Sequence, residues 1–177
     1  MLNRFYKIFI SYLEEEFEKS PIPRVNNLIE QQFQGKSQYI TICQGCKTES
    51  IRDSSFYELE LGIDVRGQSY YFNLKFLFFQ EVLTVEESIG KYLGEEELTG
   101  SNQYLCEKCN GKQDATRFIA LKELPEVLSL QLLRFYYDVQ SGSKKKKSNV
   151  LYFPTNLNMK KYIRNPTLPD EEYTYIL

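Results

Sequence analysis

The sequence predicts a strand-rich α+β fold with a four-cysteine zinc site. Three observations lead to this prediction: a helical apolar pattern at the N-terminus, several segments of alternating apolar and polar residues, and two CxxC units. Alternation with a period of two is typical of half-buried strands, whereas a period of 3.6 is typical of helices. With 177 residues, the chain is long enough for one domain with a sizeable core.

The composition narrows the possible functions. Aromatic residues make up 15% of the chain, which favours strand-rich structure. The net charge of −2 gives no electrostatic reason to expect nucleic acid or a membrane as a partner. The chain contains no histidine, which removes the commonest general base and the commonest zinc ligand other than a thiol. A Cys–His enzyme therefore cannot be built from these residues alone.

The four cysteines form two CxxC units, one from Cys43 to Cys46 and one from Cys106 to Cys109, with residues 47–105 between them. Two residues between thiols allow a tight turn to aim both sulfurs at one point. Two such turns supply the four thiolates of a tetrahedral zinc site. Because four thiolates leave no ligand position open for water, the predicted zinc is structural rather than catalytic.

Glycine and asparagine stand beside both units. Gly45 and Gly111, with Asn110, are predicted to provide the permissive backbone that such turns need. The alternatives are disulfides or a redox CxxC, but a redox motif needs only one CxxC, and a disulfide framework is typical of small secreted chains. Thiols spaced for metal also favour a reducing compartment, so we expect an intracellular protein of the cytoplasm or the nucleus.

The N-terminal third is expected to contain one helix and two strands. Apolar residues at i, i+3, i+4 and i+7 predict a helix from Leu2 to about Glu18, which the prolines of residues 20–23 end. No signal-peptide cleavage site follows it, and no apolar run is long enough to span a bilayer. The segment Gln38–Cys43 alternates and is β-branched, so it is predicted as a strand that enters the first cysteine turn. The second strand follows that turn.

That second strand, Ser55–Ile63, alternates cleanly, with Glu58 and Glu60 on its solvated face. Residues 69–82 are nearly all aromatic or aliphatic. They fit a buried strand, or else an atypical aromatic insertion, which as an exposed segment would promote aggregation.

The middle of the chain is predicted to hold a capped helix and two strands. Thr84 and Glu87 have the spacing of a capping box, and Gly94 can close the helix that they begin. Short strands are expected at residues 103–106, which enter the second cysteine turn, and at residues 115–121.

The strongest predicted strand is Val127–Tyr137, which is apolar on both faces, as a central buried strand would be. Arg134 within it needs a partner if it is buried.

Residues 138–147 are a loop by composition. We interpret its four lysines as a solvated hairpin tip rather than a nuclear-import or nucleic-acid patch, because the net charge gives no support to such a patch. Further strands are expected at residues 149–153 and 171–177.

The order of these pieces resembles the ubiquitin-specific proteases, the peptidase family of ubiquitin carboxyl-terminal hydrolases. The resemblance covers nearly the whole chain. Its most specific parts are the paired CxxC units and the run Leu-Pro-x-Val-Leu-x-Leu-Gln-Leu-x-Arg-Phe at Leu124–Phe135. It implies a part, the fingers and palm, of the cysteine-proteinase-like fold of that family, which is a right hand with thumb, palm and fingers. In this part an antiparallel sheet would carry a zinc-ribbon fingertip.

On this resemblance, residues 1–20 are a remnant thumb helix, residues 38–122 are the fingers with their zinc ribbon, and residues 123–177 are palm strands. Residues 138–147 would be a mobile loop beside the channel for the ubiquitin tail. The implied partner is ubiquitin or a ubiquitinated protein, with no nucleic acid and no membrane. The implied ligands of the fingertip zinc are Cys43, Cys46, Cys106 and Cys109.

The catalytic boxes of the family are not found in this chain. The family's nucleophile box, of the Asn-x-x-Cys-Tyr type, precedes the first helix, whereas Cys43 is the first cysteine here. The family's Gly-His-Tyr box follows the strand that begins at about Tyr173, and the chain ends at Leu177. A thiol protease needs a thiolate and an imidazole within hydrogen-bond reach. We therefore expect no catalytic residue, no cofactor site besides the zinc, and an inactive chain on its own.

Two interpretations of function remain open. The chain is a fragment of a deubiquitinating cysteine protease that hydrolyses the isopeptide bond at the ubiquitin C-terminus, or it is a natural non-catalytic zinc-ribbon module that binds ubiquitin. We favour the fragment, because both boxes are missing cleanly rather than substituted. On this interpretation we hypothesise that residues 69–82 are a translated retained intron; the alternative is a real insertion packed against the palm. A nucleic-acid-binding zinc ribbon is disfavoured, because charges near the cysteine turns, such as Glu49, Arg52 and Lys108, are mixed in sign.

Overall fold

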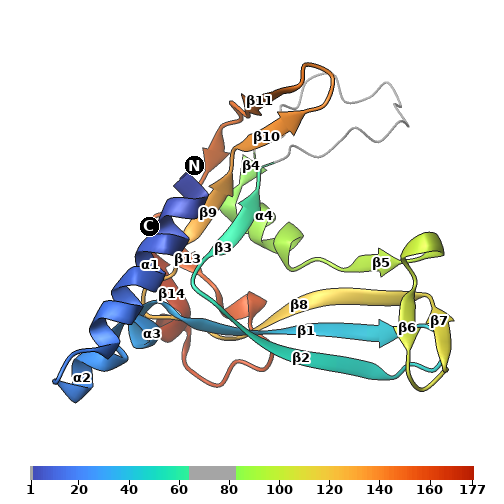
Figure 1. Ribbon diagram of the computed structural model, residues 1–177, viewed down its shortest axis with the longest axis horizontal. Coiled ribbons are helices and arrows are strands. Elements are labelled where there is room, and N and C mark those ends of the chain that lie inside the picture. The colour runs from blue at the N-terminus through green and yellow to red at the C-terminus, as the bar shows by residue number, and fades with distance from the viewer. Residues whose placement is uncertain (1, 64–82) are drawn as a thin grey trace.

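The computed structural model describes residues 2–63 and 83–177 (Figure 1). The aromatic segment 69–82, for which the sequence predicts a buried strand or an insertion, lies outside the described residues. The described residues form an α+β fold. A long antiparallel ribbon extends to one side, while helices and short paired strands gather at its other end (Figure 1).

The ribbon is a four-stranded sheet in the order β2-β1-β8-β5, and each strand is antiparallel to its neighbours. Tyr39, in the middle of β1, pairs with Arg52 on β2 and with Ile119 on β8. The β-branched and aromatic residues of β1 suit this pleated, half-buried position. The predicted strands at residues 38–43 and 115–121 are confirmed, and both extend further than predicted. The strand bounds are β1 Gly35–Cys43, β2 Glu49–Phe56, β5 Glu96–Leu98 and β8 Ala115–Glu123.

A small hairpin closes the far end of the ribbon. Its strands are β6 (Tyr104–Cys106) and β7 (Gly111–Gln113), which pair antiparallel, and the single turn η1 (Gly100–Asn102) leads into it from β5. Figure 1 shows this hairpin beside the end of β1 and the start of β2.

Three helices precede the ribbon: α1 (Leu2–Glu18), α2 (Pro23–Asn26) and α3 (Leu28–Phe33). The predicted helix at the N-terminus is confirmed. Pro23 occupies the first turn of α2, where its missing N–H costs nothing. The predicted apolar face of α1 is only partly buried: Ile10 is buried, whereas Phe5 and Phe9 are exposed and stack on each other with ring centroids 5.8 Å apart.

The predicted capped helix is α4 (Val85–Tyr92). The Glu87 N–H donates to Thr84 Oγ1 at 3.2 Å, and the Thr84 N–H donates to Glu87 Oε2 at 3.3 Å, so the capping box is complete. Gly94 follows the C-cap residue and donates its N–H to the carbonyl of Lys91 at 3.2 Å. Both helix signals in the sequence are therefore confirmed.

The main hydrophobic core lies where α4 meets the short strands at the base of the ribbon. It joins residues from both halves of the chain, because C-terminal segments pack against α4 and β3 (Leu59–Gly62). The buried members of this core are Leu59, Leu61, Val85, Ile89, Leu121, Leu157, Met159, Ile163 and Tyr173.

The single strand predicted at residues 55–63 is wrong. Strand β2 ends at Phe56, and β3 begins at Leu59 and pairs in parallel with β9 (Leu130–Leu133). The chain leaves one sheet for another between these strands, so the alternation does not continue in one frame. Glu58, predicted to face solvent, is instead buried at 8% exposure, with its Oε1 3.5 Å from Lys7 Nζ.

The central buried strand predicted at residues 127–137 is also wrong. It is divided at Arg134 into β9 and β10 (Phe135–Asp138). The Arg134 N–H donates to the Leu132 carbonyl at 2.8 Å, a tight turn that ends β9. Arg134 has the partner that the sequence demanded, because its Nη1 donates to the carbonyl of Asn149 at 2.9 Å. Within the described residues, β9 pairs only with β3, so it is no central strand.

The lysine-rich segment belongs to an antiparallel hairpin of β10 with β11 (Ser143–Lys146). The predicted hairpin and the solvated lysines are confirmed, but the predicted loop is wrong for residues 143–146, because these lysines lie on strand β11 and not at the tip. The remaining strands are short. Strand β12 (Leu151–Tyr152) runs parallel to β4 (Leu83–Thr84), and β13 (Asn156–Asn158) runs antiparallel to β14 (Thr174–Ile176). The turns η2 (Lys160–Tyr162) and η3 (Asp170–Tyr173) lie between β13 and β14, so the strand predicted from residue 171 begins three residues late. None of the helices in residues 2–63 and 83–177 combines the length and the apolar character that crossing a bilayer requires.

Candidate metal centre

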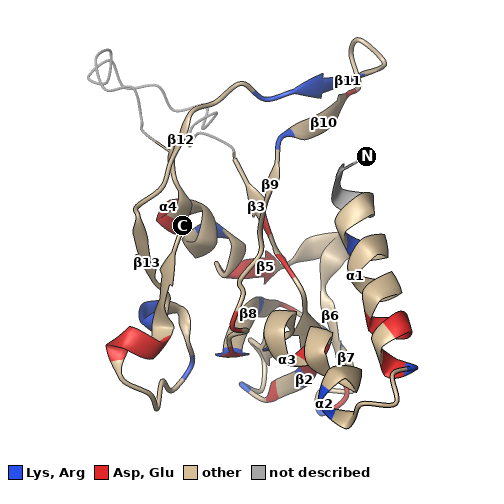
Figure 2. Ribbon diagram, turned by 90° about the vertical axis from the view of Figure 1, so that its left-hand side faces the viewer, with Lys and Arg blue, Asp and Glu red and all other residues tan. Residues whose placement is uncertain are grey.

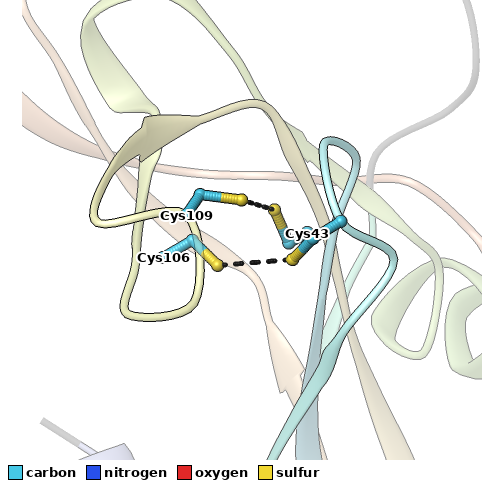
Figure 3. A group of neighbouring side chains, drawn as sticks. Cys43, Cys106 and Cys109 are labelled. Atoms are coloured by element: carbon cyan, nitrogen blue, oxygen red, sulfur yellow. Dashed lines mark hydrogen bonds between the residues drawn. The ribbon is translucent and has the colours of Figure 1, made fainter.

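All four cysteines meet at the tip of the ribbon. Figure 3 labels three of them, Cys43, Cys106 and Cys109. Cys43 ends β1, and Cys46 lies in the turn from β1 to β2. Cys106 ends β6, and Cys109 lies in the turn from β6 to β7. Each CxxC unit is thus a strand end followed by a tight turn, and the two turns face each other across the tip.

The sulfur atoms have the spacing of a four-thiolate metal site. Cys43 Sγ lies 3.8 Å from Cys109 Sγ, Cys46 Sγ lies 3.6 Å from Cys106 Sγ, and all four lie within 4.8 Å of one another. A tetrahedral zinc ion with Zn–S bonds of about 2.3 Å holds its sulfurs about 3.8 Å apart. The four cysteines therefore lie at a distance compatible with a structural zinc ion.

The disulfide alternative does not fit this geometry. Disulfide sulfurs are about 2.05 Å apart, whereas these sulfurs are 3.6 Å apart or more, and the four cysteines are free. Two disulfides would also bring each sulfur close to one other sulfur only. Here all four sulfurs lie within 4.8 Å of one another.

The two turns share one backbone feature, which the sequence indicated only at Asn110. Lys47 and Asn110, each directly after the second cysteine of its unit, have left-handed φ angles of 57° and 52°. The predicted role of Gly45 and Gly111 as residues with special backbone conformation is therefore wrong, and only the part assigned to Asn110 is confirmed. Asparagine tolerates this conformation well; lysine adopts it only where the surrounding structure enforces it.

Gly45 instead lies where the two turns approach each other closely. A Cβ atom placed on Gly45 would lie 2.7 Å from Gln113 Oε1 and 3.6 Å from Cys109 Sγ. The two turns approach so closely at this point that only a hydrogen atom fits without displacing Gln113. Gly111 is under no such restriction, because a Cβ there would meet only the Cys109 carbonyl at 3.9 Å.

Hydrogen bonds from Gln44 fix the first turn to the start of β8. Its backbone N–H donates to the Asp114 carbonyl at 2.7 Å, and its Nε2 donates to Thr116 Oγ1 at 2.6 Å. Gln103 Nε2 donates to Asp114 Oδ1 at 2.8 Å, so Asp114 also holds the strand that leads to Cys106. Sequence reasoning missed Gln44 and Asp114, because nothing in a single sequence distinguishes a cross-linking side chain from a solvated one.

The thiols perturb one another. Hydrogen bonding to the side chain and backbone of Thr48, whose Oγ1 lies 3.3 Å from Cys46 Sγ, lowers the pKa of Cys46 to about 6. Two causes raise the pKa of Cys109 to about 12: the larger is hydrogen bonding to the Cys46 sulfur, and the second is desolvation by burial. One ionised sulfur therefore opposes ionisation of the next. Four adjacent thiolates require a cation among them, and a zinc ion would supply that charge.

The fold and this site define a class of protein: an α+β domain with an antiparallel ribbon that ends in a four-cysteine cluster suited to structural zinc. The family model described as ubiquitin carboxyl-terminal hydrolase matches residues 2–177. The chain therefore belongs to the ubiquitin carboxyl-terminal hydrolase family, as its resemblance to the ubiquitin-specific proteases predicts.

Curated relatives support the same assignment. The chain is 40% identical over 175 residues to ubiquitin carboxyl-terminal hydrolase 48 of Danio rerio, covering 99% of this chain and 15% of the relative. It is 35% identical over 176 residues to ubiquitin carboxyl-terminal hydrolase 26 of Oryza sativa subsp. japonica, covering 98% of this chain and 15% of the relative. Its particular likeness to the ubiquitin carboxyl-terminal hydrolase 48 type, which we also recognise in the sequence, is confirmed. The chain thus spans about a seventh of the length of these relatives.

Proposed function

We propose that this chain forms the ubiquitin-binding fingers and palm of a deubiquitinating cysteine protease domain, which in the complete enzyme hydrolyses the isopeptide bond at the ubiquitin C-terminus. Family membership over residues 2–177 is the observation that carries the proposal. The proposed division assigns residues 1–20 to the thumb, 38–122 to the fingers and 123–177 to the palm. The ribbon from β1 and β2 to the cysteine tip agrees with the finger assignment (Figure 1).

Zinc at the tip is part of the same proposal. Cys43, Cys46, Cys106 and Cys109 would hold the ion, and its chemistry would be structural, because four thiolates complete its coordination. The protein would then bind ubiquitin in the cytoplasm or the nucleus, where ubiquitinated proteins and reduced thiols coexist.

One face of the ribbon offers a surface for the partner. Tyr39, Arg52 and Ile119 are cross-strand neighbours and therefore share that face. Arg52 lies over the Tyr39 ring at 5.2 Å from its centroid, a stacked arrangement that holds the guanidinium in place. A hollow of about 600 Å³ lies here, lined among others by Tyr39, Arg52, Tyr92, Glu96, Tyr104 and Arg117. Tyrosine and arginine are the residue types that most often dominate binding energy at protein interfaces.

Calorimetric titration of the zinc-loaded chain with ubiquitin tests the proposal. We expect binding that Arg52→Glu weakens by about tenfold or more, because the substitution reverses the charge and removes the stack. Lys122→Glu is the matched control. It makes the same charge change on an exposed residue of β8, whose Nζ is 3.4 Å from Asp53 Oδ1. No binding by the folded, zinc-loaded chain, or equal losses in both variants, would contradict the proposed surface.

A second candidate function is a non-catalytic ubiquitin-binding zinc-ribbon module. The observation that favours it is the absence of histidine from the chain, together with the placement of every cysteine in the cluster. Both candidates predict that the chain alone binds ubiquitin and does not cleave a ubiquitin C-terminal amide. The two candidates differ in the coding sequence that they require. The protease interpretation requires a cysteine box and a histidine box in the same reading frame, whereas the module requires neither.

A further inference from the structure

The β10–β11 hairpin carries the densest positive charge of the described chain. The segment from Arg134 to Lys147, with both ends included, contains five basic residues and one acidic residue, although the chain as a whole has a net charge of −2. Figure 2 shows β11 as a continuous basic strand at the end of the molecule away from α2. Lys144, Lys145 and Lys146 are all exposed.

The pairing register sorts these lysines into two groups. Lys146 pairs with Phe135, and Lys144 pairs with Tyr137, so these four side chains share one face of the hairpin. Lys145 lies on the opposite face and is neutralised by an ion pair with Asp138.

Lys144 and Lys146 form no ion pair with the residues that the structure describes. Their aromatic neighbours are also uncovered, since Phe135 is 65% and Tyr137 is 62% exposed. One face of the hairpin therefore combines two unneutralised cations with two open rings.

The outer edge of β11 is open as well. Within residues 2–63 and 83–177, β11 pairs with β10 alone, so its outward-facing N–H and C=O groups have no strand beside them. Lysines on such an edge normally prevent the addition of another strand. The same lysines favour one kind of strand, namely one whose acidic side chains lie beside them.

We propose that the open edge of β11 binds an extended acidic peptide segment of a partner protein. Backbone pairing along β11 supplies the contact that any strand can make, and Lys144 and Lys146 restrict it to strands with carboxylates at alternate positions. The side chains between those carboxylates point to the opposite face, on which Lys145 is paired with Asp138. This edge lies in the proposed palm, and it shares no residue with the hollow on the ribbon that is proposed to contact ubiquitin.

A peptide fits these observations better than the two other polyanions, single-stranded nucleic acid and an anionic membrane. Open backbone groups recognise a strand but contribute little to binding a phosphate backbone. The net negative charge of the remaining chain also repels a long polyanion that extends beyond the hairpin, whereas a short segment confined to β11 remains within the local positive field.

Fluorescence anisotropy with a labelled peptide of alternating glutamate and valine tests this proposal. We expect binding that weakens with added salt and that falls by about tenfold or more in the double variant Lys144→Glu, Lys146→Glu. The neutral double variant Lys144→Gln, Lys146→Gln should show a smaller loss and guards against disruption of the hairpin by new like charges. The control Arg24→Glu, Lys161→Glu makes the same charge change at exposed positions outside the hairpin and should bind normally.

Two further probes separate strand addition from simple charge attraction. A peptide N-methylated at every second residue loses the backbone donors on one edge, and we expect it to bind at least about tenfold more weakly. A single-stranded oligonucleotide and vesicles of anionic phospholipid should bind more weakly than the peptide. Equal binding of the N-methylated peptide, tighter binding of the oligonucleotide or the vesicles, or unchanged binding by the charge-reversed hairpin would overturn the proposal.

Discussion

The hydroxyl of Tyr57 donates a hydrogen bond to the carboxylate of Glu14 and thereby ties α1 to the segment that joins β2 to β3. The same hydroxyl accepts a hydrogen bond from Gln34 Nε2 at 2.9 Å, just before β1 begins. Burial raises the pKa of Tyr57 to about 12, so the hydroxyl keeps its proton at physiological pH. One side chain thus connects the helical end of the molecule to the point where the chain changes sheets.

Replacing Tyr57 by phenylalanine is expected to destabilise the fold by about 1–2 kcal/mol, because it leaves both Glu14 and Gln34 without this partner. Urea denaturation of the zinc-loaded protein measures the change. Tyr12→Phe is the matched control, because Tyr12 lies on α1, as Glu14 does, but is 57% exposed. Equal effects of the two substitutions would mean that the Tyr57 hydroxyl does not secure α1.

The cysteine cluster makes a direct prediction about metal content. Purified protein should contain zinc in equimolar amount, and Cys106→Ser should lose the metal and the cooperative thermal transition together. Structural zinc contributes on the order of 10 kcal/mol of binding free energy that is coupled to folding, far more than one hydrogen bond. Elemental analysis and calorimetry measure the two losses. The control is Thr48→Ala, which removes a hydrogen-bond partner of Cys46 but keeps all four thiols; it should retain zinc. A Cys106→Ser protein that still melts cooperatively without metal would contradict a structural role.

The capping box of α4 predicts a moderate loss when it is broken. Thr84→Ala removes the acceptor of the Glu87 N–H and should lower the free energy of unfolding by about 1 kcal/mol. Thr99→Ala is a suitable comparison, because Thr99 precedes η1 as its N-cap without a side-chain hydrogen bond. Chemical denaturation of both variants should show a loss in the first and almost none in the second; the reverse order is incompatible with the capping geometry.

Glu58 predicts a pH effect of unusual sign for a carboxylate. Burial is the largest cause that raises its pKa above the ordinary 4.5, and the nearby Lys7 opposes this only in part. The folded state therefore binds this proton more tightly than the unfolded state. The contribution of Glu58 to stability is greatest below its unfolded pKa and is lost as the pH rises through the higher folded pKa.

Glu58→Gln tests this effect, because glutamine stays neutral at every pH. The difference in urea midpoint between the natural protein and the variant should change in favour of the variant as the pH rises from about 4.5 towards neutrality. Glu95→Gln, at an exposed position after α4, serves as the reference. A midpoint difference that does not change with pH would show that Glu58 has no raised pKa in the fold.

Local signals in the sequence predicted local structure well. The capping box at Thr84 places α4, the prolines after Glu18 end α1, and the alternation before Cys43 places β1. The cysteine spacing predicted the cluster because two CxxC turns present four thiols whatever the intervening chain does. The capping box, the prolines, the alternation and each CxxC unit depend on residues within a few positions of one another, so a single sequence contains them. That the two distant CxxC units meet was inferred from the four ligands that a structural zinc ion requires.

Features that depend on distant pairing were not predictable. Residues 127–137 are apolar enough for a central strand, yet they divide at Arg134, because β9 and β10 have different partners. Glu58 lies where the chain passes from β2 to β3. The alternation that predicted a solvent-facing side chain therefore does not apply to it, and Glu58 is buried. The left-handed backbone at Lys47 accompanies a hydrogen bond from its N–H to the Cys43 carbonyl at 2.9 Å, and nothing in the residue type lysine indicates that conformation.

The division of the proposed metal ligands between two turns also has a kinetic consequence. Each turn alone supplies half of a coordination sphere, and the halves meet only after β1 has found β8, a pairing between residues far apart in the chain. Such non-local pairing is slow compared with the closing of a turn. Cobalt takes the place of zinc in tetrahedral thiolate sites and becomes strongly coloured there. It would therefore be a spectroscopic probe of the folding kinetics. The appearance of its colour in a refolding sample would mark the moment at which the two halves of the ribbon come together.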